Sequence, residues 1–69
     1  MARYMVQYKQ KYTGKVCESD LFDTYVSALN ESLYIMGLGV AKTIVVLRDS
    51  EGEDHPDNAG KFFLCRIIK

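Results

Sequence analysis

The chain has one histidine, His55, and two cysteines, Cys17 and Cys65. The cysteines stand far apart, without the CxxC pairing of a zinc or redox site, and two are too few for the disulfide framework of a small secreted domain. We expect reduced thiols packed as small hydrophobic side chains. A lone histidine has no partner for a Cys–His or Ser–His–Asp arrangement, so the sequence predicts no catalytic residue and no enzyme.

The sequence also lacks any continuous apolar run of about 18 residues. It has no hydrophobic segment behind a basic start, and alanine rather than the glycine of an acylation signal at position 2. We therefore expect a soluble, cytoplasmic protein with no membrane partner.

The chain lacks a net charge: its 9 basic and 9 acidic residues give a formal net charge of zero. A duplex-binding protein usually carries a basic excess that neutralises phosphates, and that signature is missing. The charges are nevertheless segregated: residues 49–57 hold only acidic charges, and residues 1–17 hold only basic ones, Arg3, Lys9, Lys11 and Lys15. Oppositely charged patches of this kind can orient a partner or a second copy of the chain. A simpler explanation is that charged residues collect at the solvent-exposed ends of hairpins.

The length of 69 residues predicts a single compact domain over residues 1–69, without a separate substrate domain. A hydrophobic content of 48% argues against bulk disorder. A chain near this length buries only about 60% of its unfolded surface, so its core gives little surplus stability. Association with a partner or a second copy is therefore expected.

Alternation over residues 3–12 predicts a half-buried strand. Its two faces are expected to carry Tyr4, Val6, Tyr8 and Tyr12 on one side and Arg3, Gln7, Lys9 and Lys11 on the other. The tyrosine rings are predicted to pack in the core. The glycine of Thr13–Lys15 suits a tight turn, and residues 15–18 are expected to return as a short strand.

A helix is predicted to follow, with Ser19 or Asp20 as its N-cap and Gly37 as its end. Its core-facing stripe is expected to consist of Phe22, Val26, Leu29, Leu33 and Met36, which recur at steps of four and three residues.

Residues 43–48 and 61–69 are rich in β-branched and aromatic residues and predict two further strands. The fold class is therefore α+β, with the order strand, strand, helix, strand, strand and one helix packed on one face of an antiparallel-dominated sheet. The last two strands are apolar on both sides, yet only one helix is available to cover them. Either a partner or second copy covers the other face, or the sheet curls around the helix, or tyrosines fold over its back.

The acidic stretch DSEGEDHPDN, residues 49–58, has the composition of a metal site but not the pattern. Aligned on an EF-hand from Asp49, it has Asp54 at the position that requires glycine and Gly60 at the position that requires glutamate. We interpret it as a loop between two strands, and we expect no metal and no cofactor.

The sequence predicts a small non-enzymatic interaction protein of inhibitor or regulator type, with a protein partner or a second copy and no small-molecule substrate. In size and layout alone it resembles small antagonists encoded by phages and mobile elements, such as CRISPR inhibitors. The expected partner-binding residues are Tyr4, Tyr8, Lys9, Lys11, Tyr12, Tyr34, Glu51, Glu53, Asp54 and Phe63. In one variant, the acidic stretch mimics phosphate in a partner's groove. The alternative function is nucleic-acid binding by the basic and aromatic first strand.

Overall fold

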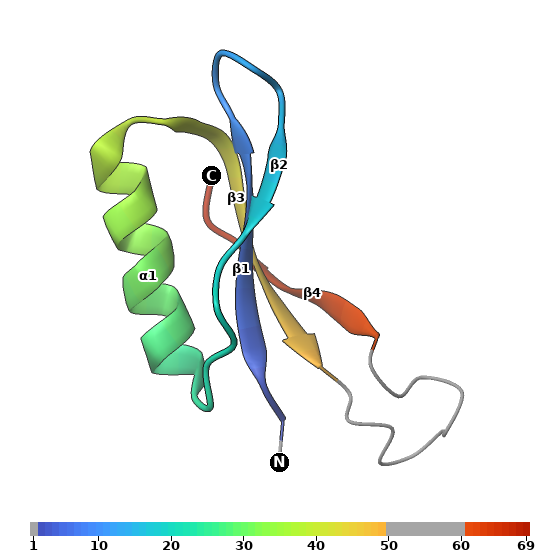
Figure 1. Ribbon diagram of the computed structural model, residues 1–69. Helices are drawn as coiled ribbons and strands as arrows, with labels where there is room; N and C mark the ends of the chain where they lie inside the picture. Colours follow the sequence, from blue (N-terminus) through green and yellow to red (C-terminus); the bar gives the residue numbers. More distant parts are fainter. Residues whose placement is uncertain (1, 50–60) are drawn as a thin grey trace.

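The computed structural model describes residues 2–49 and 61–69, and it confirms the predicted α+β fold and the order of its elements. Four antiparallel strands form one sheet in the order β2-β1-β3-β4, and the helix packs on one face of it (Figure 1). The elements are β1 (Tyr4–Gln10), β2 (Val16–Glu18), α1 (Tyr25–Leu38), β3 (Ala41–Asp49) and β4 (Phe62–Ile67).

Strands β1 and β3 form the centre of the sheet, and β2 and β4 form its edges. The β1–β3 pairing sets Val6 opposite Val46. In the β3–β4 pairing the register shifts between Val46 and Leu47, so that Cys65 has no opposite residue on β3. Such a shift inserts one extra residue into β4, a β-bulge.

The helix begins and ends later than the sequence predicts. Thr24, rather than Ser19 or Asp20, is the N-cap, and its hydroxyl accepts a hydrogen bond of 3.2 Å from the Ser27 amide. Gly39, rather than Gly37, follows the last turn, with φ 71°. Glycine adopts this left-handed conformation without the steric cost that a side chain adds.

The predicted N-cap residue Ser19 belongs to the sheet edge instead. Its hydroxyl accepts a hydrogen bond of 2.9 Å from the Val6 amide, and its own amide donates to the Val6 carbonyl oxygen at 2.8 Å. Phe22 likewise pairs with Tyr4 through two backbone hydrogen bonds of 2.8 Å. Residues 19–22 therefore run beside β1, to which the backbones of Ser19 and Phe22 are hydrogen-bonded before the helix begins.

The predicted core-facing stripe of the helix was wrong for Val26, Leu33 and Met36, whereas Leu29 is half-buried and Phe22, which precedes the helix, packs against the core. The buried residues of α1 are Ala28, Ser32 and Ile35, whereas Val26 is 62% exposed. Two of the three buried side chains are small, which lets a helix backbone approach a sheet closely. The Ser32 hydroxyl donates to the Leu29 carbonyl oxygen at 2.6 Å, so it is buried with a partner. Of the other predicted stripe residues, Leu33 and Met36 are also exposed.

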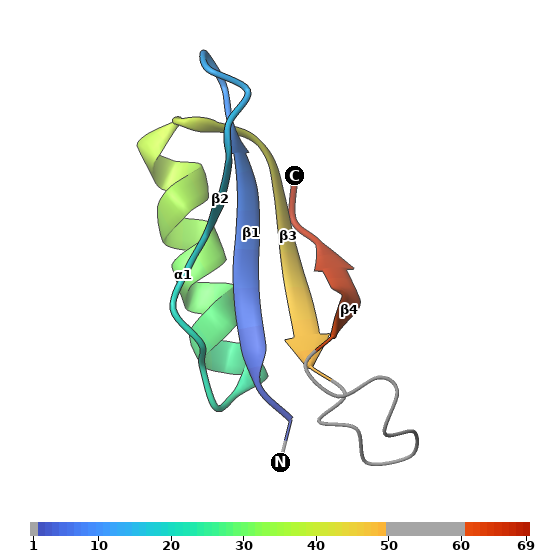
Figure 2. The same ribbon diagram turned by 45° about the vertical axis from the view of Figure 1, so that its right-hand side comes forward.

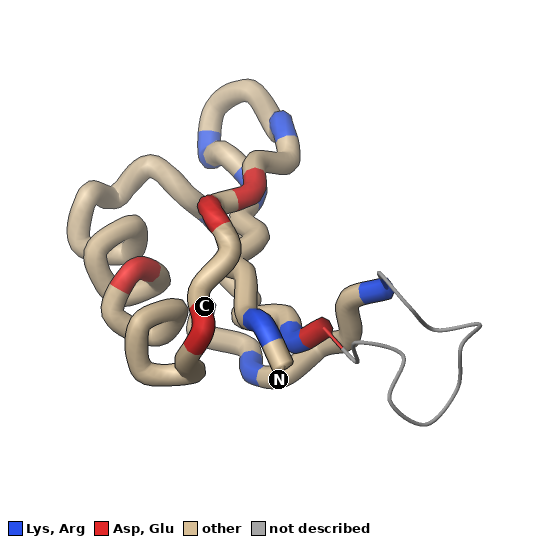
Figure 3. The backbone as a smooth tube through the Cα atoms, turned by 60° about the horizontal axis from the view of Figure 1, so that its bottom comes forward, with Lys and Arg blue, Asp and Glu red and all other residues tan. Residues whose placement is uncertain are grey.

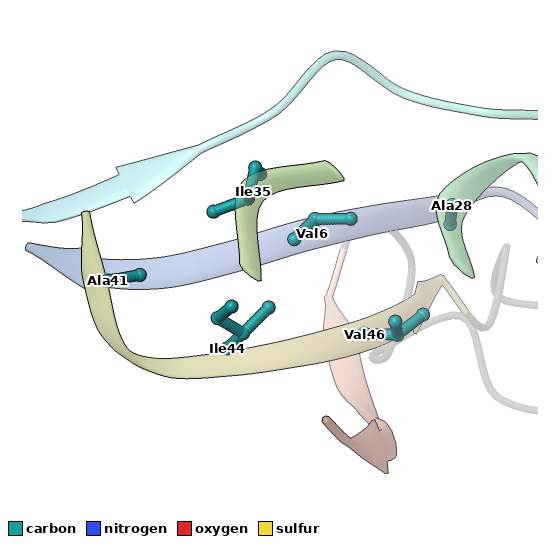
Figure 4. Close-up of a cluster of buried hydrophobic side chains, with 6 residues drawn as sticks. All are labelled: Val6, Ala28, Ile35, Ala41, Ile44 and Val46. Atoms are coloured by element: carbon teal, nitrogen blue, oxygen red, sulfur yellow. The ribbon is translucent and has the colours of Figure 1, made fainter. Parts of the chain in front are cut away.

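The core lies between α1 and the sheet face that β1 and β3 turn toward it (Figure 4). It consists of Val6, Ala28, Ile35, Ala41, Ile44 and Val46. Tyr4 and Tyr8 pack at its border, as predicted. The ring of Tyr4 meets that of Tyr25 edge to face, with centroids 6.0 Å apart.

The opposite sheet face, which we call the open face, is covered by no described element. Side chains alternate between the two faces of a strand, so the residues between those that contact α1 belong to the open face. They are Met5, Gln7, Lys9, Val16, Glu18, Thr43, Val45, Leu47, Asp49, Phe62, Leu64 and Ile67. Tyr4 and Tyr8 lie on the helix side, so the proposal that they fold over the back of the sheet was wrong.

Among residues 2–49 and 61–69, no helix has both the length and the apolar character needed to cross a bilayer.

Candidate functional site

The open face carries an apolar strip across β3 and β4. Val45 and Leu47 are half-buried in the middle of the sheet. Their β4 partners are much more exposed, with Ile67 opposite Val45 and Leu64 opposite Leu47. Ile67 is 64% exposed and Leu64 is 59% exposed. Large apolar side chains that lie together on a surface are typical of an interaction site.

Strand β4 extends beyond the cover of the helix. In two views α1 lies over β1 and β3, and β4 projects from the far side of the sheet (Figures 1 and 2). Phe63, which pairs with Arg48 on the helix side, is exposed as well. Strand β4 therefore presents exposed apolar side chains on both of its faces.

The C-terminal end of β4 is nevertheless held firmly. Arg66 Nη1 donates a hydrogen bond of 3.0 Å to Tyr25 Oη on α1, and this bond raises the pKa of the guanidinium. The Ile68 amide donates to the Ile44 carbonyl oxygen at 2.9 Å, and Ile68 packs against the core. The exposed side chains of β4 are thus presented by an ordered strand rather than by a frayed end.

The two cysteines differ in environment. Cys17, on β2, is half-buried, whereas Cys65, at the bulge of β4, is exposed. Both are free thiols, as expected, but the prediction that both are packed was wrong for Cys65.

The predicted aromatic anchors do not form one surface. Tyr4 and Tyr8 support the core, and burial, followed by the contact with Cys17, raises the pKa of the Tyr8 hydroxyl. Tyr34 is exposed on α1, and Phe63 is exposed on β4. Of these four residues, Phe63 alone belongs to the exposed part of β4.

The tip of the β1–β2 hairpin is the second candidate surface. Strand β1 ends at Gln10, so Tyr12 leaves the sheet and is 91% exposed, contrary to the packed ring that alternation predicts. Tyr12, Gln10, Thr13 and Val40 line a hollow of about 240 Å³.

Basic residues gather at the same tip (Figure 3). Lys11 and Lys15 are exposed, and Lys9 is half-buried on the open face. The Lys11 amide donates to the Val40 carbonyl oxygen at 2.8 Å, which brings the exposed Lys42 into the neighbourhood of the hairpin.

The first carboxylate of the acidic stretch has a structural role. Asp49 is buried at the end of β3, and its Oδ2 atom accepts hydrogen bonds from Arg3 Nη2 at 2.8 Å and Nε at 3.3 Å. The predicted partner-binding residues Glu51, Glu53 and Asp54 lie outside the described residues. Within the described ranges, no three side chains of the metal-ligating types come together.

The exposed large apolar residues of the open face, Val16, Leu64 and Ile67, were not among the predicted binding residues. The signal that points to Leu64 and Ile67 is the apolar character of residues 61–69 on both faces, combined with a chain that has one helix. The apolar pattern predicts that this strand needs a cover. The strand order then shows that the strand, β4, lies at an edge of the sheet.

Comparisons with family models, with curated proteins and with solved structures found no match for this chain.

Proposed function

We propose that the protein acts without catalysis, as an inhibitor or regulator that binds another protein through its open face. The observation that carries this proposal is the exposure of Leu64 and Ile67 beside the half-buried Val45 and Leu47. Fully burying one side chain of this size contributes roughly 1.5–3 kcal/mol relative to leaving it exposed, and a partner supplies the burial that remains.

The composition of the open face supports this proposal. Its apolar strip is bordered by polar and charged side chains toward β2, namely Gln7, Lys9, Glu18 and Thr43. Protein interfaces have this layout, with an apolar centre that excludes water and a polar rim that sets orientation. The cytoplasm is the proposed location, because two free thiols suit a reducing compartment.

Replacing Ile67 with lysine tests the open face. We expect Ile67→Lys to lower capture of the partner from a host lysate at least about tenfold, because a charge then enters the apolar centre of the interface. Quantitative mass spectrometry of captured proteins measures the effect. Val26→Lys is the matched control, because Val26 is similarly exposed but lies on the helix, and it should capture as the parent chain does.

A protein captured equally by all three chains would contradict the proposal. Thermal melts followed by circular dichroism must show that Ile67→Lys folds, so that lost capture reports on the surface. The exposure of Ile67 makes a folded variant the expected result.

A second candidate function is binding of single-stranded nucleic acid at the hairpin tip. The observation that favours it is the exposed Tyr12 ring beside the hollow that it shares with Val40. Single-strand binders stack bases on such rings and hold phosphates with nearby lysines, a role that Lys11, Lys15 and Lys42 suit here.

Titration of a fluorescent single-stranded oligonucleotide at low and moderate salt tests this candidate. We expect Tyr12→Ala to weaken binding about 5- to 150-fold, the equivalent of about 1–3 kcal/mol for one stacked base. Lys11→Glu should weaken binding and flatten its salt dependence, because a phosphate contact is lost. Lys61→Glu, an exposed lysine just before β4, is the control. Affinity weaker than high micromolar at low salt would remove this candidate.

A further inference from the structure

We propose that two copies of the chain join through the outer edges of their β4 strands, paired antiparallel about a twofold axis. This inference goes beyond binding of another protein by the open face, and it concerns the backbone edge rather than the face. The two edges of the sheet differ in length and in charge.

The β2 edge is protected in the way natural proteins protect edges. It is three residues long, carries the exposed Glu18 and follows the exposed Lys15. Short length and charge both discourage a second chain from adding to a sheet.

The β4 edge has neither protection. It is six residues long, and its only charged residue is Arg66, whose guanidinium donates to Tyr25 Oη. The structure describes no strand beyond it in the sheet. An ordered, apolar edge of this length is a template for pairing with another strand.

Charge favours a second copy as the occupant. The chain has a formal net charge of zero, so two copies do not repel each other through net charge. In an antiparallel pairing of β4 with itself, centred near the middle of the strand, Arg66 lies off the axis and does not meet its own equivalent. Each copy also presents the same uncovered apolar residues, as an isologous contact requires.

A register with its twofold axis at the middle of β4 matches the two faces of the strand despite the bulge at Cys65. Phe63 and Arg66 both lie on the helix side, opposite Arg48 and Val46 of β3. A twofold axis between Leu64 and Cys65 sets Phe63 opposite Arg66 of the second copy, and both side chains then share a face, as antiparallel partners must. The guanidinium can stack on the ring in a cation–π contact.

The same twofold axis also pairs residues of the open face with residues of the open face of the second copy. Phe62 and Ile67 both lie on the open face, opposite Asp49 and Val45. The register sets Phe62 opposite Ile67 of the second copy, an aromatic and β-branched pair that stabilises sheets. No like charges meet within the paired strands.

The axis stands perpendicular to the sheet, because only this orientation places the same edge of two copies side by side and antiparallel. Both copies of α1 then lie on one side and both open faces on the other. The apolar strips of the two copies become one continuous surface across the dimer.

Light scattering after size exclusion, over a range of concentrations, tests the dimer. We expect the parent chain to reach the mass of two chains, and Phe63→Lys to weaken association at least about tenfold, because lysine then faces Arg66 of the second copy at two symmetric positions. Phe63→Glu should stay a dimer, because its carboxylate meets that arginine. Tyr34→Lys, an exposed aromatic on α1, is the control and should not alter the mass.

Cys65 supplies an independent test of the register. In a Cys17→Ser background, a short bis-maleimide should link two chains through Cys65, which lies beside the proposed axis and is exposed. Cys65→Ser with Cys17 retained should not link. The mass of one chain at every concentration would overturn the dimer, and equal dissociation by Phe63→Lys and Phe63→Glu would overturn the register.

These outcomes are separate from those of the open-face experiment. A chain that stays single while its capture of a protein depends on Ile67 would overturn the dimer and leave the proposed function standing. A β4-linked dimer whose captured proteins are insensitive to Ile67→Lys would do the reverse.

Discussion

Ile44→Ala is expected to lower the free energy of unfolding by about 2–5 kcal/mol. Ile44 is fully buried on the central strand β3, faces α1 and lies opposite Tyr8. The alanine side chain loses the free energy gained by burying the larger isoleucine side chain away from water. It also leaves a cavity that the closely packed neighbours on the sheet fill only partly. A domain of this size has about 3–10 kcal/mol in total, so the loss is a large fraction of the stability.

The position of Ile44 adds to the expected effect. Its backbone amide donates to the Lys69 carbonyl oxygen at 3.1 Å, and its carbonyl oxygen accepts from Ile68 and Lys69. The contacts that hold the C-terminal end of β4 thus meet at this residue. Loosening of β3 around a cavity should therefore also loosen β4.

Urea unfolding followed by circular dichroism, at low protein concentration so that association does not contribute, measures the change. Ile67→Ala is the matched control, because it makes the same chemical change at an exposed isoleucine, and it should cost well under about 1 kcal/mol. Equal losses from the two substitutions would mean that the core does not lie between α1 and the sheet.

The fold was predictable because its signals are local. Each element is specified by its own part of the sequence. Period-two alternation predicts the first strand, Gly14 predicts a turn, in which it adopts φ 71°, and the two β-branched runs predict the last two strands. Their order then leaves few ways to place one helix on a sheet. Strand order was not accessible in the same way, because it depends on pairing between segments that are far apart in the chain.

The buried face of α1 was wrongly predicted because the most hydrophobic residues of a helix are not the most buried ones where its backbone lies close to the sheet. Ala28 and Ser32 contact the sheet because they are small, and the larger Val26, Leu33 and Met36 are left at the surface. The stripe of large apolar residues, which faces the core in most surface helices, therefore does not mark the buried face of this one.

The candidate site was partly predictable for a related reason. Apolar residues on both faces of 61–69 predicted a strand with a face that needs a cover. Within residues 2–49 and 61–69 no element covers the open face of β4, which is an edge strand beyond the helix. Tyr12 was misplaced because alternation was extended past Gln10, where the pairing of β1 with β3 shifts register and the strand ends.

Arg3→Ala is expected to lower the free energy of unfolding by about 1.5–3 kcal/mol, the range for hydrogen bonds to charged groups. Its two hydrogen bonds to Asp49 join the residue before β1 to the last residue of β3. The carboxylate side chain is 1% exposed and the arginine side chain 47%, so the pair is partly shielded from water and the loss falls below that of a fully buried pair.

Urea unfolding of Arg3→Ala, Arg3→Lys and Arg48→Ala separates charge from geometry. Arg3→Lys should recover part of the loss, because lysine restores the charge but cannot reproduce the donor pair of Nε and Nη2. Arg48→Ala, an exposed arginine on β3, should stay within about 0.5 kcal/mol of the parent chain. A double-mutant cycle with Asp49→Asn isolates the energy of the pair. A coupling energy near zero would show that Asp49 is held at the end of β3 without Arg3, and the start of β1 would then be free to fray without affecting the strand that supports β4.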